Sequence, residues 1–223
     1  MKSNIVILVK NRIIIYISYI YDMRTIIYPL TLQSKYYKQL IEMGKIKKGC
    51  RILDIGSGTG ILGMLLNKLY GDSISYYAID SGKYVTKASQ IKGKSNNGKN
   101  KVVRGRIESI PFADNSFDLV YCNLVIHHLA QDVLEFSLDE IKRVLKPKGT
   151  LYVFDYCPTR SFVHYAMYII TYIWTSVYEN GKVLFQGKMP IYLEENGFKN
   201  IKEFPISDLF PLAIYRATNG TIK

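Results

Sequence analysis

The residues most clearly suited to binding a ligand lie between positions 51 and 60. This stretch reads Arg-Ile-Leu-Asp-Ile-Gly-Ser-Gly-Thr-Gly, so that an acid, a serine and three alternating glycines accompany a short apolar run. Glycines, which lack Cβ, let a ligand lie against bare backbone, and a helix that begins just after them offers unpaired N–H groups and a partial positive charge. The pattern therefore predicts a strand, a glycine turn and a helix start that together bind a nucleotide-like ligand.

Two kinds of ligand compete for this turn. Gly58-Thr-Gly60-Ile-Leu-Gly63 satisfies G-x-G-x-x-G and Asp80 follows Gly58 by 22 residues, which is the spacing of a nicotinamide dinucleotide site. In a dinucleotide fold, however, the first glycine of the fingerprint closes the strand, whereas here Gly56 closes it. Asp54 then lies near the ligand edge, and a carboxylate there suits a cationic ligand better than a pyrophosphate.

The surrounding chain alternates between strand and helix patterns. The expected strands cover 52–55, 74–80, 102–103, 117–123 and 150–156, and the last two runs, 201–206 and 212–217, form a hairpin. The expected helices cover 32–41, ended by Gly44, then 60–70, 82–91, 131–145 before Pro147 and Gly149, and 190–196, with a polar loop at 92–101. This alternation predicts an α/β fold with a doubly wound, mostly parallel seven-stranded sheet and a C-terminal antiparallel hairpin.

Length and cysteine content narrow the protein class. A chain of 223 residues suits one domain, and its three cysteines have no metal-binding spacing, so we expect a reducing compartment and no metal site.

The apolar runs 5–9 and 13–21 are interrupted by Lys10, Asn11 and Arg12, and each is shorter than a membrane span of ~20 residues. We expect this segment to cap the ligand, with an interfacial anchor as the alternative, and a start at Met23 would remove most of it.

Four motifs in order carry a resemblance to a known family. They are Leu53-Asp54-Ile55-Gly56-Ser57-Gly58-Thr59-Gly60, Ala78-Ile79-Asp80, the run 110–120 (IPFADNSFDLV), and Ile126-His127-His128-Leu129 with the run 144–151 (VLKPKGTL). Together they resemble the class I S-adenosylmethionine-dependent methyltransferases, in the group of small-molecule and quinone methyltransferases. The resemblance covers about residues 35–156. It implies a chain with an N-terminal extension at 1–32, a cofactor-binding core at 33–156, and an acceptor-side segment with the closing hairpin at 157–223.

The resemblance also implies a cofactor site for S-adenosyl-L-methionine. Asp54 and the turn of Gly56, Ser57, Gly58 and Gly60 would hold the methionine part, and Asp80 would hold the ribose hydroxyls, because a carboxylate accepts two hydroxyl protons. A cap for the following helix is the alternative role of Asp80. Ser81 and Asn123 complete the predicted site.

One position departs from the family. Gly105-Arg106-Ile107-Glu108 replaces the usual Gly-Asp-Ala-Glu, whose aspartate accepts a hydrogen bond from the adenine amino group. Arg106 has only donors, so it would stack on the adenine or pair with Glu108. The adenine contact would then fall on the backbone of Ile107 and on apolar packing.

Methyl transfer asks little of the protein beyond alignment, because the sulfonium is already an activated donor. An acceptor with a hydroxyl or an acidic carbon gains from a base, and His127 or His128, just after the fourth strand, is placed to act as one. We expect at most one of them to do so. The alternative for either is a histidine packed under the cofactor.

The positions of charged and aromatic residues indicate whether RNA, an apolar acceptor or a membrane surface could bind. The formal charge is +12, and residues 83–106 contribute eight basic residues without an acid. Transfer-RNA wobble-uridine methyltransferases also carry an Ile-His-His-type segment, but a helix-to-strand loop such as 92–101 lies opposite the ligand edge, so we expect a solvated loop. Segment 161–178 is rich in Tyr and Trp, which suits an apolar acceptor, a membrane surface or ordinary core packing.

These observations lead to one predicted function and three alternatives. We expect a cytoplasmic enzyme, with peripheral membrane contact left open, that transfers a methyl group to a small apolar acceptor such as a quinone or lipid precursor. The alternatives are a transfer-RNA methyltransferase, a nicotinamide-dependent oxidoreductase and a non-catalytic cofactor-binding subunit.

Overall fold

The computed structural model describes residues 30–95, 101–166, 169, 184, 186–206, 208 and 210–220. The N-terminal runs at 5–9 and 13–21, and most of segment 161–178 with Tyr168, Tyr172 and Trp174, lie outside the described residues. Within the described part of the chain, no helix is long and apolar enough to cross a membrane.

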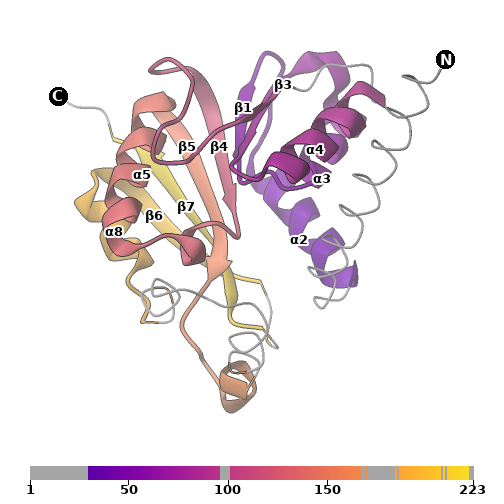
Figure 1. Ribbon diagram of the computed structural model, residues 1–223. Coiled ribbons are helices and arrows are strands. Elements are labelled where there is room, and N and C mark those ends of the chain that lie inside the picture. Colours follow the sequence, from indigo (N-terminus) through magenta and orange to yellow (C-terminus); the bar gives the residue numbers. More distant parts are fainter. Residues whose placement is uncertain are drawn as a thin grey trace.

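A seven-stranded sheet forms the centre of the molecule, in the order β3-β2-β1-β4-β5-β7-β6 (Figure 1). Its strands are β1 (Arg51–Ile55), β2 (Ser75–Asp80), β3 (Lys101–Arg104), β4 (Phe117–Asn123), β5 (Leu145–Tyr156), β6 (Phe198–Pro205) and β7 (Leu212–Asn219). The pairs from β3 through β5 are parallel, and β7 is antiparallel to both β5 and β6. The predicted fold class and the closing hairpin are therefore confirmed.

Helices cover both faces of this sheet. Helices α2 (Leu30–Met43), α3 (Ile61–Tyr70) and α4 (Lys83–Ser95) lie on one side, and α5 (Gln131–Val144) and α8 (Met189–Glu195) lie on the other (Figure 1). The strand order reverses between β1 and β4, with β2 on one side of β1 and β5 on the far side of β4. In an open α/β sheet, ligands bind outside the carboxyl ends of the strands at this reversal point.

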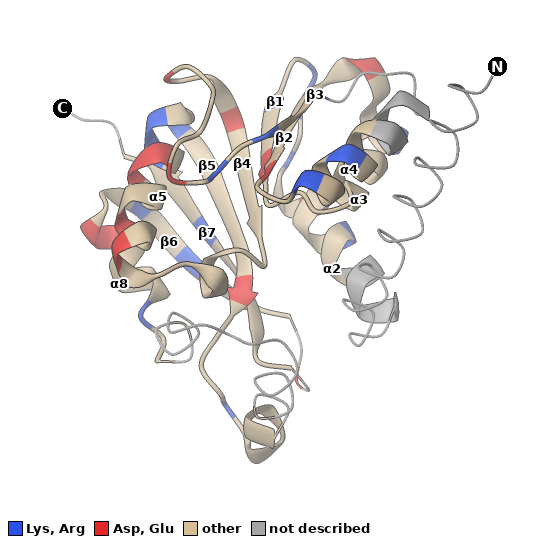
Figure 2. Cartoon of the chain, viewed as in Figure 1, with Lys and Arg blue, Asp and Glu red and all other residues tan. Residues whose placement is uncertain are grey.

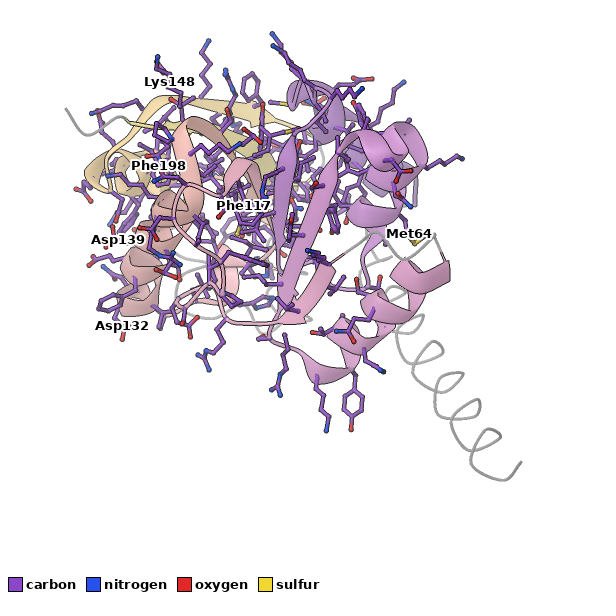
Figure 3. The ribbon with its side chains drawn as sticks, turned by 90° about the horizontal axis from the view of Figure 1, so that it is seen from above. Met64, Phe117, Asp132, Asp139, Lys148 and Phe198 are labelled. Carbon is purple, nitrogen blue, oxygen red and sulfur yellow. The ribbon has the colours of Figure 1, made fainter. Side chains whose placement is uncertain are left out.

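Periodicity explains how these elements dock. Helix α5 buries Leu134, Leu138, Ile141 and Val144, which recur at the helical period, while Asp132 and Asp139 point outward (Figure 3). Strand β4 is buried at five of its seven positions, as expected for a central strand covered on both faces. Phe117 of β4 lies in the middle of this packed region (Figure 3).

Two predicted boundaries were wrong by four residues or more. Helix α4 runs to Ser95, so the predicted polar loop 92–101 begins inside a helix, and Lys101 already belongs to β3. Strand β5 begins at Leu145 rather than at Thr150, because Leu145 pairs with Phe117 before the pairing moves to Leu119 with Thr150. Pro147 and Gly149 therefore mark an irregular part of a strand, with Lys148 at a φ of +64°, rather than a separate loop.

Candidate active site

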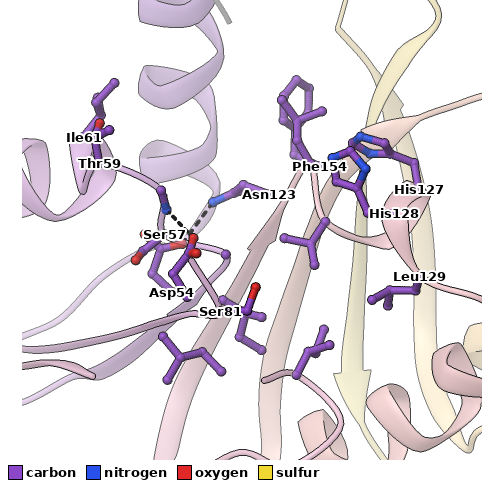
Figure 4. Close-up of a pocket in the computed structure, with 18 of the residues that line it drawn as sticks. Asp54, Ser57, Thr59, Ile61, Ser81, Asn123, His127, His128, Leu129 and Phe154 are labelled. Atoms are coloured by element: carbon purple, nitrogen blue, oxygen red, sulfur yellow. Dashed lines mark hydrogen bonds between the residues drawn. The ribbon is translucent and has the colours of Figure 1, made fainter. Parts of the chain in front are cut away.

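A cavity of about 510 Å³ opens at the carboxyl ends of β1, β2, β4 and β5 (Figure 4). The structure brings to this cavity every predicted site residue except Gly60: Asp54, Gly56, Ser57, Gly58, Asp80, Ser81, Arg106, Ile107, Asn123, His127 and His128. These residues come from segments far apart in the sequence. Their convergence follows from the parallel sheet, which gathers the carboxyl ends of its strands at one edge.

Asp54 is the buried charge of this cavity, with 1% of its surface exposed. Asn123 Nδ2 donates a hydrogen bond to Asp54 Oδ1 at 3.3 Å (Figure 4). Tyr76 Oη donates to Asp54 Oδ2 at 2.6 Å. Burial, reinforced by the charge of Asp80, outweighs these two bonds and raises the pKa of Asp54 to about 7. A cationic ligand would favour the ionised form, so the site is poised to bind one.

The glycine turn leaves room for a ligand at Gly58. Its φ is +53°, and a Cβ there would meet nothing within 4 Å, so the space above it belongs to the cavity. Gly60 lies behind the turn instead, where a Cβ would collide with Ser89 Oγ. Its role in the structure is close packing of the turn against α4.

Asp80 ties two turns together at the end of β2. Its Oδ2 accepts the Gly58 N–H at 2.9 Å, and its Oδ1 accepts the Gly82 N–H at 2.8 Å, just before α4. The capping alternative is thus present in the structure. Each carboxylate oxygen has more than one lone pair, so these bonds still leave acceptor capacity for ligand hydroxyls.

Arg106, which replaces the aspartate usual in the family, forms an ion pair with Glu108, and its side chain is 73% exposed. Ile107, between them, is buried and presents an apolar surface at this end of the cavity. Of the two roles considered for Arg106, pairing with Glu108 is the one the structure shows. Because the pair is exposed, it contributes little to stability.

Arg143 and Glu140 of α5 hold the loop that follows β3. Arg143 Nη2 and Nη1 donate to the carbonyls of Ile110 and Phe112 at 2.9 and 2.8 Å, and Nη1 also donates to Asp114 Oδ1 at 2.7 Å. Its Nε and Nη2 donate to the two oxygens of Glu140, and Glu140 Oε2 accepts the Ile110 N–H at 2.7 Å. All five guanidinium N–H groups are therefore used, and sequence reasoning did not single out either residue.

His127 forms a buried pair with Asp155, which sequence reasoning missed. Its Nδ1 lies 2.8 Å from Asp155 Oδ1, and its backbone N–H donates to Asp155 Oδ2. Because a carboxylate only accepts, we assign the ring proton to Nδ1, which leaves the Nε2 lone pair to accept a proton. The signal for Asp155 was a single acid in the apolar strand run 151–156.

His128 lies against His127, with ring centroids 3.8 Å apart, and also lines the cavity (Figure 4). Loss of solvent around its ring, with a smaller effect of His127, lowers the pKa of His128 to about 4. At neutral pH it is uncharged and a weak base. Of the two predicted candidates, the geometry therefore favours His127.

Apolar and aromatic residues form the end of the cavity beside His127. They are Tyr36 of α2, Leu129, Phe154 and Tyr156 at the end of β5, Ile206 and Leu212. Sequence reasoning expected segment 161–178 to supply this lining, but its described residues Phe162 and Tyr165 are exposed and do not line the cavity. Among the described residues, strand ends and α2 supply this lining. Tyr168, Tyr172 and Trp174 lie outside the described part of the chain, so the expectation for segment 161–178 stays a prediction.

The cavity also contains polar atoms that lack partners within the protein. In the described part of the chain, five buried side-chain nitrogen or oxygen atoms have no hydrogen-bond partner, and three of them, Tyr36 Oη, Ser57 Oγ and Asn123 Oδ1, belong to its lining. Buried polar groups are normally paired, so unpaired ones in a cavity indicate a polar ligand. S-adenosyl-L-methionine fits this wall, since Asp54 suits its cationic end, Gly58 leaves open space and Asp80 can accept hydroxyls.

The strand order, the reversal point and this site define the class I methyltransferase fold. Residues 53–153 match the methyltransferase domain family, Methyltransf_11. Residues 53–153 therefore form a class I S-adenosylmethionine-dependent methyltransferase domain, a class whose methyl donor is S-adenosyl-L-methionine.

Similar proteins agree on this domain and differ in their acceptors. The chain is 28% identical over 138 residues to the ubiquinone/menaquinone biosynthesis C-methyltransferase UbiE of Azotobacter vinelandii, covering 61% of this chain and 54% of the relative. It is 32% identical over 127 residues to the phosphoethanolamine N-methyltransferase of Plasmodium falciparum, covering 55% and 45%. A solved methyltransferase from Aquifex aeolicus superposes with a TM-score of 0.65 at 20% identity, over 82% of this chain and 88% of that one. The chain spans about half the length of the curated relatives it matches.

Proposed function

We propose that this protein transfers the methyl group of S-adenosyl-L-methionine to a small, apolar acceptor that carries an ionisable hydroxyl. The single observation that supports it most is the composition of one cavity. Its Asp54 and Asp80 end is polar and acidic, and its other end is apolar around the His127–Asp155 pair.

The protein's own residues would act mainly by position. Asp54 and the backbone at Gly58 would hold the cationic amino-acid part of the cofactor, and Asp80 would hold its ribose hydroxyls. The bound cofactor supplies an activated methyl group on a cationic sulfur. His127 Nε2 would take the acceptor's hydroxyl proton, while Asp155 keeps the ring oriented and stabilises its charged form. These residues would hold the acceptor in line with the methyl group, and the cofactor would supply both the methyl group and the leaving sulfur, which would keep the electron pair.

The relatives give two acceptor chemistries to compare. UbiE is a quinone C-methyltransferase by name, and the Plasmodium relative acts on phosphoethanolamine by name. Phe154, Tyr156, Ile206 and Leu212 can bury a ring, whereas a phosphate needs cations. Among the lining residues that the structure describes, the only Lys or Arg is Arg106, at the opposite end. This contrast supports the ring-bearing acceptor.

A comparison of the methyl-transfer rates with different acceptors tests the proposal. The protein is incubated under reducing conditions with radiolabelled S-adenosyl-L-methionine and one of three acceptors. They are reduced 1,4-naphthoquinone, here called naphthoquinol, phosphoethanolamine, and bulk transfer RNA. Methyl transfer to naphthoquinol at a rate at least tenfold above that to phosphoethanolamine is expected. The reverse preference would overturn the apolar acceptor, and transfer to a transfer RNA alone would assign the protein to the alternative class.

A further inference from the structure

Tyr36 carries a hydroxyl that the folded protein leaves unused. The residue is 4% exposed, and its Oη has no hydrogen-bond partner in the part of the chain that the structure describes. Its ring stacks on Phe154 with centroids 3.6 Å apart, and both residues line the cavity. A buried hydroxyl without a partner costs stability, so a ligand that accepts its proton would recover this cost.

Other buried tyrosines of the core show how unusual this is. Tyr76 Oη donates to Asp54, Tyr152 Oη donates to the Met43 carbonyl at 2.5 Å, and Tyr215 Oη donates to the Tyr156 carbonyl at 3.3 Å. These hydroxyls are satisfied by the fold itself. Tyr36 differs in that its unpaired hydroxyl belongs to the lining of the ligand cavity.

The surroundings of Tyr36 keep its hydroxyl a donor. Burial, followed by the neighbouring Tyr37, Asp54 and Asp155, raises the pKa of Tyr36 well above its usual value. The hydroxyl therefore stays protonated across the physiological range and can donate to an oxygen that gains negative charge. Because these carboxylates disfavour a tyrosinate, Tyr36 is not a base.

Tyr36 lies at the apolar end of the cavity, away from the groups suited to the cofactor's adenosine. It packs on Phe154, the residue immediately before Asp155, and Asp155 holds His127. The groups suited to the ribose and adenine, Asp80 and Ile107, belong to the ends of β2 and β3 on the other side of β1.

We propose that Tyr36 Oη donates a hydrogen bond to an oxygen of the methyl acceptor, and that this donor makes a ring-borne hydroxyl the preferred acceptor group. The inference rests on the proposed function and adds a residue from α2 to the site. As His127 takes the acceptor's proton, the negative charge that develops on the acceptor is shared with this hydrogen bond. The bond is thus stronger when the acceptor reacts than when it first binds, which accelerates transfer.

The experiment compares Tyr36→Phe with Tyr152→Phe as the matched control. Tyr36→Phe removes a hydroxyl that has no internal partner, so the free protein should melt at the same temperature as wild type or higher. S-adenosylhomocysteine should bind within twofold of wild type, and kcat/KM for naphthoquinol should fall at least tenfold. Tyr152→Phe removes a bonded hydroxyl, so its melting temperature should fall while kcat/KM stays within threefold.

Several results would overturn the inference. A melting temperature for Tyr36→Phe that falls as far as that of Tyr152→Phe would show an internal structural role. A loss of S-adenosylhomocysteine affinity equal to the loss of kcat/KM would show a contact to the cofactor instead. Unchanged kcat/KM beside active wild type would refute the inference and leave the proposed function intact, whereas wild type that binds no S-adenosylhomocysteine would refute the proposed function itself.

Discussion

Asp54 illustrates how one residue can link ligand affinity to pH. Its pKa of about 7 results from burial, and only its ionised form attracts the cationic end of the cofactor. We therefore expect the affinity for S-adenosylhomocysteine to rise between pH 5.5 and pH 7, by up to about tenfold per pH unit. Calorimetric titration across this range measures it. Asp54→Asn should bind weakly with a flat profile over the same range, and an equally steep profile in this variant would exclude Asp54 as the titrating group.

The same residue has the opposite effect on the free protein. Its pKa is raised on folding, so the folded protein holds a proton that the unfolded chain releases near pH 4. The contribution of Asp54 to stability is therefore present at acidic pH and is lost as the pH rises through 7. At neutral pH the buried, partly ionised Asp54 therefore lowers the stability of the free protein, and a bound cationic ligand offsets this loss.

His127 and Asp155 should separate chemistry from cofactor binding. His127→Ala removes the base, and Asp155→Asn removes the carboxylate that orients it, so each should lower kcat with naphthoquinol by roughly 10²-fold to 10⁴-fold. Binding of S-adenosylhomocysteine should stay within about threefold of wild type. His128→Ala serves as the control, since its low pKa makes it a weak base. If His128→Ala loses more activity than His127→Ala, the assignment of the base is reversed.

Among individual residues, those that stand in a local sequence motif could be predicted. Those brought to the cavity only by tertiary packing were missed. Asp54, Gly58 and Asp80 stand at strand ends in recognisable motifs, so their convergence could be predicted. Tyr36 looks like any apolar position of a helix, and only its stack on Phe154 brings it to the cavity. Such contacts join residues more than a hundred positions apart, which no local pattern encodes.

Among the elements, α5 holds through Arg143 the loop after β3, whose residues Ile107 and Glu108 line the cavity. Arg143→Lys keeps the charge but cannot reproduce five N–H bonds in a planar fork. We expect the dissociation constant and KM for S-adenosyl-L-methionine to rise about tenfold, with kcat at saturation nearly unchanged. Steady-state kinetics and calorimetry measure these values.

The neighbouring residue Asp139 offers the control for this prediction. It lies on the outward face of the same helix, so Asp139→Asn should leave both constants unchanged (Figure 3). A fall in kcat for Arg143→Lys without a change in cofactor affinity would contradict the role of α5 in holding the loop after β3.

Element order was predictable, whereas two element boundaries were not. Periodicity identified each of the strands β1 to β7, because buried strands read as apolar runs between turn residues. Pro147 and Gly149 locally suggest a break, and only the pairing of Leu145 with Phe117 shows that β5 has already begun. Likewise α4 continues through Ser95, although the sequence there is as polar as a loop.

At the scale of the whole molecule, charge is distributed unevenly over the two faces of the sheet. Lys and Arg mark α4 on one face, whereas on the other face α8 carries Glu and α5 carries residues of both signs (Figure 2). The cavity lies between these faces at the sheet edge, where Asp54 and Asp80 give it local acidity. The overall charge of +12 therefore does not describe the ligand site.

We expect the glycine turn and its carboxylates to bind S-adenosyl-L-methionine, and a thermal-shift titration measures this binding. At a ligand concentration a hundred times the dissociation constant, binding adds about 2.7 kcal/mol, which for a chain of this size raises the melting temperature by roughly 5 to 10 °C. Gly58→Ala should abolish this shift by placing a methyl group where the ligand approaches the backbone. Gly49→Ala, also at a positive φ with open space around it, should lower the unliganded melting temperature but keep the shift. No shift in wild type, or an equal shift with NAD, would contradict the assignment of S-adenosyl-L-methionine to this site.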